Sequence, residues 1–121
     1  MESNKKLNDA KTAIRFIDGL YPIIASSNQI NRHVEDELDK LKQQFETYIH
    51  LQELFKEMGV NLNKWDSSYD LESFMFCSQV AKKHLSSIYR YIVPYIVEGK
   101  IKNVRQELRI IHWIIKKWDK R

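Results

Sequence analysis

Apolar residues recur at steps of three and four along most of this chain, and no other feature of the sequence constrains the fold as strongly. Residues three or four apart lie on one face of an α-helix, whereas a half-buried strand needs strict alternation. No segment shows an alternating pattern that competes with the helical one. We therefore predict an all-α protein. The first series, over residues 4–25, consists of Leu7, Ala10, Ile14, Ile17, Leu20 and Ile24.

The next two series are long and predict extended helices over residues 28–58 and 69–98. The earlier one follows Ile30, Val34, Leu38, Leu41, Phe45, Tyr48, Gln52 and Phe55. The later one follows Leu71, Phe74, Ala81, Leu85, Ile88, Ile92 and Ile96. Gly59 and Gly99 come directly after these ranges. Glycine commonly adopts the left-handed conformation that ends a helix, so both helices should end there.

The last helix should begin at Asn103, whose side chain can cap it, with Gln106 completing a capping box. Pro22 and Pro94 should kink the first and third helices, because proline lacks a backbone donor and clashes with the preceding turn. Four helices with mostly short connections predict an antiparallel four-helix bundle. At 121 residues, of which 43% are apolar, the chain has the size and composition of one domain spanning residues 1–121.

The composition also narrows the classes of protein to consider. The longest apolar runs are far shorter than the roughly 20 residues that a membrane-spanning helix needs, and the first residues do not form a secretory signal. Cys77 is the only cysteine, so an internal disulfide cannot form, which suits a reducing compartment. The sequence contains neither a glycine-rich phosphate loop nor a serine or cysteine triad. We expect a cytoplasmic protein that has no membrane contact and no cofactor.

The positive charge of the chain is concentrated at its end. Residues 100–121 hold eight Lys and Arg against two acidic residues, although the whole chain has a net charge of only +4. On a helical wheel the apolar residues of this segment occupy an arc of roughly 160°. We assign that arc to the core: Val104, Leu108, Ile110, Ile111, Ile114, Ile115 and Trp118. On the opposite side lie Arg105, Arg109, His112, Lys116 and Lys120, with Trp113 at the border.

The cationic row and its border tryptophan form the candidate binding surface, which consists of Arg105, Arg109, Trp113, Lys116 and Lys120. Basic side chains neutralise phosphates, and an exposed indole can stack on an unpaired base. We therefore interpret the chain as a non-enzymatic accessory protein or subunit that contacts single-stranded nucleic acid or a nucleoprotein partner. A solvated basic face would explain the same residues, since lysines near a helix C-terminus also favour the negative end of the dipole.

Arg105 and His112 permit an enzymatic interpretation as well. Six residues separate them, and this spacing resembles the R-x(4–6)-H motif of the HEPN family, all-helical proteins that include metal-independent ribonucleases. The resemblance implies that His112 acts as acid or base while Arg105 holds the scissile phosphate. Histidine titrates near neutrality and arginine binds phosphate bidentately, so the chemistry is consistent. Only these two positions carry the resemblance, and such a site is commonly completed by a second copy across a dimer.

An acidic row on the second predicted helix supports a third interpretation, a protein-binding adaptor, inhibitor or assembly subunit. The row consists of Glu35, Asp39, Glu46, His50, Glu53 and Glu57. It could attract the basic face of a second copy, which would form a homo-oligomer, or that of another protein, or lie beside the basic helix within one bundle. Trp65 is a second candidate anchor for a protein partner. Because the row lies opposite the apolar series, we predict no metal site there.

Overall fold

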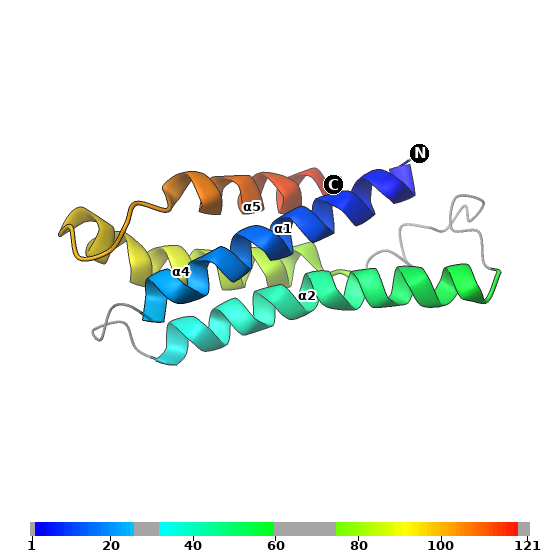
Figure 1. Ribbon diagram of the computed structural model, residues 1–121, viewed down its shortest axis with the longest axis horizontal. Coiled ribbons are helices and arrows are strands. Elements are labelled where there is room, and N and C mark those ends of the chain that lie inside the picture. Colours follow the sequence, from blue (N-terminus) through cyan, green and yellow to red (C-terminus); the bar gives the residue numbers. More distant parts are fainter. Residues whose placement is uncertain (1, 26–31, 60–74, 119–121) are drawn as a thin grey trace.

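The computed structural model describes residues 2–25, 32–59 and 75–118, which form four helices packed against one another (Figure 1). The helices are α1 (Glu2–Ala25), α2 (Arg32–Glu57), α4 (Ser78–Val97) and α5 (Arg105–Trp118). No strand occurs in the described ranges. Both α1 and α4 pack against α2 and α5. The four helices therefore surround one common core, as in a helical bundle.

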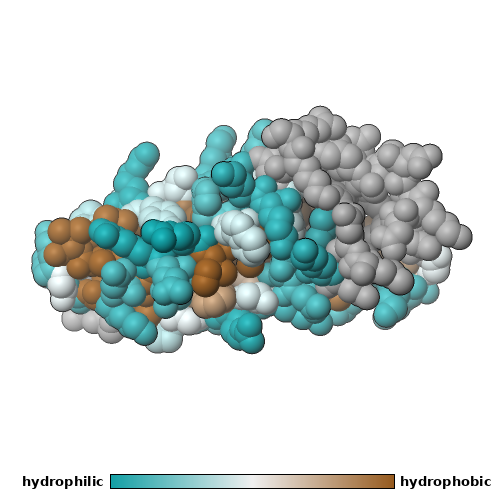
Figure 2. Space-filling view, turned by 90° about the horizontal axis from the view of Figure 1, so that it is seen from above, coloured by the Kyte–Doolittle hydropathy of each residue, from teal (hydrophilic) through white to brown (hydrophobic). Residues whose placement is uncertain are grey.

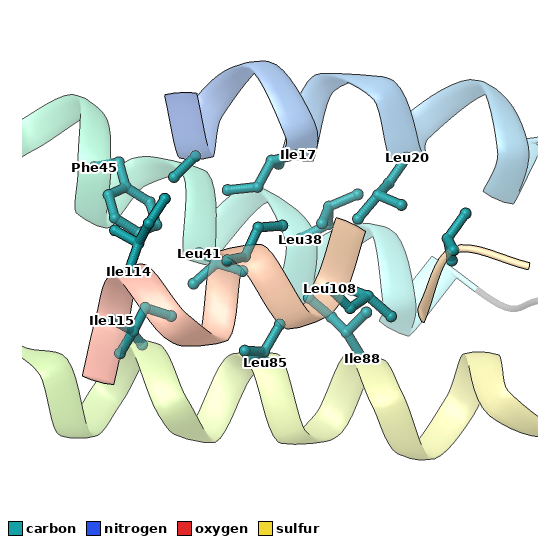
Figure 3. Close-up of a cluster of buried hydrophobic side chains, with 14 of the residues drawn as sticks. Ile17, Leu20, Leu38, Leu41, Phe45, Leu85, Ile88, Leu108, Ile114 and Ile115 are labelled. Carbon is teal, nitrogen blue, oxygen red and sulfur yellow. The ribbon is translucent and has the colours of Figure 1, made fainter. Parts of the chain in front are cut away.

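The core is built from the apolar series that the sequence displays (Figure 3). Each helix contributes side chains that are almost completely buried, and their ends meet between the four ribbons. Burying one large aliphatic side chain stabilises a fold by about 1.5–3 kcal/mol, so this convergence is the main source of stability. The labelled members are Ile17 and Leu20 of α1, Leu38, Leu41 and Phe45 of α2, Leu85 and Ile88 of α4, and Leu108, Ile114 and Ile115 of α5.

Several predicted helix boundaries agree with the structure. Gly59 and Gly99 have φ values of 77° and 74°, the left-handed conformation expected after α2 and α4. The Asn103 Oδ1 atom accepts a hydrogen bond from the Arg105 backbone N–H at 3.0 Å, so Asn103 caps α5 although the helix itself begins two residues later. Pro22 lies in the last turn of α1, and Pro94 lies inside α4.

The continuous third helix predicted over residues 69–98 is wrong at Phe76 and Cys77, where the chain leaves helical geometry. Cys77 has an extended backbone, with φ −98° and ψ 101°, and its N–H donates to Gln44 Oε1 of α2 at 3.2 Å. The centroid of the Phe76 ring lies 4.9 Å from the ring centroid of Phe45 and 4.8 Å from that of Trp118. These contacts with α2 and α5 compensate for the interrupted helix. The earlier part of that prediction, with Trp65 in the preceding loop, lies outside the described residues.

Glu37 is the buried charged side chain among the described residues, with 9% of its surface exposed. One carboxylate oxygen lies 2.6 Å from Nδ1 of His84 on α4, and the other lies 3.8 Å from Nε2 of His33 on α2. The His33 ring in turn contacts Tyr91 of α4 edge-on, with centroids 5.1 Å apart. The structure therefore joins His33 and His84 to one carboxylate between α2 and α4.

Alanine at two glycine positions should change stability in opposite directions. Gly19 is exposed inside α1 and a Cβ there would meet nothing within 4 Å, so Gly19→Ala should stabilise the fold by about 1 kcal/mol. Gly99 has a positive φ, so Gly99→Ala should cost about 1–2 kcal/mol. Urea unfolding followed by circular dichroism measures both changes. A Gly99→Ala protein as stable as the parent would contradict the left-handed turn after α4.

A double-mutant cycle should detect the contact between Glu37 and His84. Their side chains are 12% and 18% exposed, so replacing either one by leucine removes the short polar contact from a largely buried partner, at about 1–3 kcal/mol. The double variant removes both polar groups and should lose less stability than the two single variants combined. Strictly additive losses in urea unfolding would show that the two side chains do not interact.

Candidate functional site

Most of the basic residues predicted to form the binding surface lie on the exposed face of α5. The structure exposes Arg105, Arg109, His112 and Lys116. The opposite face is buried through Leu108, Ile111, Ile114 and Ile115. Packing of this apolar face therefore determines which way the cationic row points. Lys120, the last member of the predicted surface, lies outside the described residues.

Trp113 is the most exposed aromatic residue of the described helices, with 59% of its surface accessible. The Lys117 ammonium lies 4.6 Å from the centroid of its indole ring. The same ammonium forms an ion pair with Asp9 of α1 at 2.9 Å. Lys117 thus connects α5 to α1 and supports the indole from one side. Most of the indole surface remains available for a partner.

A groove of about 760 Å³ lies between α4 and α5. Its lining consists of Ser86, Tyr89, Arg90, Val93 and Pro94 from α4, together with Arg109 and His112 from α5. Two members of the exposed α5 face, Arg109 and His112, therefore share one groove with Arg90 of α4. Arg105, Trp113 and Lys116 are not among the lining residues and extend the basic surface beyond the groove.

The sequence analysis missed the contribution of α4. Arg90 stands alone within an apolar and aromatic segment, so a helical wheel of α4 gives it no special position. The available signal was the charge of the whole helix, because α4 contains three basic residues and no acidic one. That signal becomes informative only when α4 is known to pack against α5.

The pKa of Tyr89 shows how burial and positive charge act on a side chain in the groove. Burial raises the pKa of its phenol, because the charged phenolate loses hydration, while nearby Arg109 lowers that pKa by stabilising the phenolate. Burial is the larger effect, so the pKa lies above its ordinary value. The positive charge on α5 is therefore close enough to act on a side chain of α4.

Charge is distributed unevenly among the helices, with an excess of basic residues on α4 and α5 and of acidic residues on α2. Helices α4 and α5 together carry seven Lys and Arg against one carboxylate, Glu107. Helix α2 carries seven acidic residues against four basic ones. All six members of the predicted acidic row of α2 are exposed. An anionic partner is consequently attracted toward α4 and α5 and repelled by α2.

Seen from above, the surface of the molecule has apolar as well as hydrophilic areas (Figure 2). Hydrophobic patches interrupt a mostly hydrophilic surface, and one of them covers the end of the molecule where α4 connects to α5 in Figure 1. Val97, at the end of α4, is 69% exposed. Apolar and cationic surface therefore both occur around the α4–α5 pair.

The groups in the groove are those that bind anions. Two guanidinium groups, an imidazole and two hydroxyl groups line it, and arginine matches the geometry of phosphate with paired hydrogen bonds. In the described part of the chain, no three His, Cys, Asp or Glu side chains are grouped so that they could hold a metal ion. Cys77 is half-buried and forms no disulfide.

In comparisons with known proteins, no family model matches the chain, and neither a curated protein nor a solved structure matches it. The resemblance to the HEPN motif therefore rests on Arg105 and His112 themselves. The structure places these two residues about two turns apart on α5, and His112 lines the groove whereas Arg105 does not. Among the helices in the described ranges, none combines the length and apolar character needed to cross a membrane.

Removing the charge of Arg109 should raise the pKa of Tyr89 further. The guanidinium favours the phenolate, so Arg109→Gln leaves burial without an opposing effect. The titration of Tyr89 can be isolated as the difference between the ultraviolet absorbance titrations of each protein and its Tyr89→Phe version. An unchanged or lowered pKa in Arg109→Gln would contradict the proximity of the two side chains.

Proposed function

We propose that this protein is a non-enzymatic helical-bundle module that binds single-stranded nucleic acid, free or within a nucleoprotein, through the face formed by α4 and α5. The observation that supports this proposal most strongly is the groove that brings Arg90 of α4 together with Arg109 and His112 of α5. A solvated face needs no such convergence from two helices. The excess of basic residues on these two helices supports the same proposal.

The binding mechanism follows from the side chains on this face. Arg90 and Arg109 contact phosphate within the groove, while Arg105 and Lys116 continue the positive surface along α5. Each neutralised phosphate releases counterions, which makes binding strongly dependent on salt. Trp113 offers an exposed ring on which a base can stack.

The finer features of the fold belong to the same proposal. We propose an antiparallel bundle, with kinks at Pro22 and Pro94, in a cytoplasmic protein. Support for the antiparallel order comes from two contacts between α2 and α4, since Gln44 meets Cys77 while the earlier Glu37 meets the later His84. Opposite chain directions place the start of α5 beside the end of α4, and thereby bring Arg109 opposite Arg90.

The proposal is tested by fluorescence anisotropy of a labelled single-stranded RNA at about 50 and about 200 mM salt. We expect binding at low salt that weakens steeply at the higher salt. The variant Arg109→Glu/Lys116→Glu should bind at least about tenfold more weakly, because both charges are reversed on the proposed surface. The matched control, Lys40→Glu/Lys56→Glu, changes the net charge equally on exposed positions of α2 and should retain most of the affinity.

Circular dichroism of each variant must show an intact helical fold. Equal losses of affinity in the two double variants would contradict a specific surface on α4 and α5. No binding at the lower salt would reject the nucleic-acid proposal. The protein-binding interpretation, with the acidic row of α2 as docking surface, would then take its place.

Metal-independent RNA cleavage is a second candidate function, favoured by one observation. His112 and Arg109 both line the groove, so an imidazole, a common general acid or base, shares it with a guanidinium of the kind that binds phosphate. Arg109 is better placed for this role than Arg105, which the sequence had selected. A denaturing gel of the anisotropy samples tests it. Cleavage that persists in the parent protein and disappears in His112→Ala, with RNA binding retained, would replace the non-enzymatic proposal.

A further inference from the structure

The lining of the groove changes in character along its length. Ser86, Arg90 and Pro94 follow one another at successive turns of α4, and together they extend about 12 Å along the helix. A hydroxyl lies at one end, a cation in the middle and an apolar ring at the other end. On α5, His112 and Arg109 add an imidazole and a second cation. The groove therefore has a polar part and an apolar part.

The cationic part comes from both sides of the groove. Arg90 and Arg109 belong to different helices and both are exposed. Within the described residues neither guanidinium forms an ion pair with a carboxylate, and the single acidic residue of the two helices is Glu107. Two guanidinium groups facing one groove repel each other until an anion lies between them. A phosphate group, which each can bind with two hydrogen bonds, fits this position.

The apolar part needs a different chemical group. Val93 and Pro94 form the apolar end, and the half-buried ring of Tyr89 lies one turn away. Inorganic phosphate, or the backbone of a duplex, would leave this wall uncovered, because the bases of a duplex are stacked and paired in its interior. An unpaired base has flat faces that apolar and aromatic side chains can cover.

We infer that the groove between α4 and α5 holds one unstacked nucleotide of a single strand, with its phosphate between Arg90 and Arg109 and its base against Tyr89, Val93 and Pro94. This inference rests on the proposed function and adds to it the unit that the groove recognises. The groove volume of about 760 Å³ lies in the range of small-molecule sites, about 300–1,000 Å³. The protein therefore distinguishes a single strand from a duplex of the same length.

The experiment measures the affinity of the protein for three RNA probes by anisotropy at one low salt concentration. The probes are a short single strand, the duplex of that strand with its complement, and the same single strand made of abasic units. We expect the base-containing single strand to bind about tenfold more tightly than the other two, the effect of about one stacked base. All three probes carry phosphates, so a surface that binds through charge alone would bind them with similar affinity.

Three variants test whether the groove residues cause the tighter binding of the base-containing single strand. Arg90→Gln should weaken the binding of the single strand about tenfold, whereas Lys83→Gln, which removes the same charge from another exposed position of α4, should weaken it less than about twofold. Val93→Ser removes part of the apolar wall without changing charge. It should weaken the base-containing strand and leave the abasic strand unaffected. Circular dichroism shows whether the half-buried Val93 position tolerates the change, and Arg90→Gln at an exposed position keeps the test valid if it does not.

The outcomes separate this inference from the proposed function. If the single strand, the duplex and the abasic strand bind equally well, the nucleotide site is rejected while nucleic-acid binding by α4 and α5 stands. Equal effects of Arg90→Gln and Lys83→Gln would also reject the site. If none of the probes binds, the inference and the proposed function fail together.

Discussion

Burial of the apolar face of α5 between α1 and α4 is the constraint on which the rest of the structure depends. Leu108, Ile111 and Ile115 are inaccessible to solvent, so rotating α5 would expose several large side chains, each at about 1.5–3 kcal/mol. This energy holds the helix in one orientation. The basic residues at the remaining positions of the wheel must then face outward, beside α4. The same packing that stabilises the fold thus creates the cationic surface and closes one side of the groove.

The sequence predicted the parts of the fold that depend on a single helix. Periodicity located the helices, Gly59 and Gly99 marked two ends, and the wheel of residues 104–118 separated core from surface. It failed where a second helix decides the conformation. The interruption at Cys77 depends on Gln44 of α2, because that side chain accepts the backbone N–H which a continuous helix would otherwise satisfy. Nothing near Cys77 in the sequence signals this partner.

The candidate site shows the same division between local and tertiary information. Arg109 and His112 could be selected from the sequence because the charges of α5 follow its own helical period. Arg90 could not, since its importance arises from the packing of α4 against α5, which brings it into the lining of the groove. Glu37 was missed for a similar reason. It occupies a position within the apolar series of α2, between Val34 and Leu38, and its partner His84 comes from another helix.

The central claim, that α4 and α5 form one anion-binding surface, is tested most directly by nitrogen–proton correlation NMR of the arginine side chains. Single-stranded RNA is added stepwise while the Nε–H signals of Arg90, Arg109 and Arg32 are followed. We expect the signals of Arg90 and Arg109 to shift together and to give one dissociation constant, while Arg32 on the acidic helix α2 stays unchanged. Shifts confined to α5, or equal shifts of Arg32, would contradict a shared surface built from two helices.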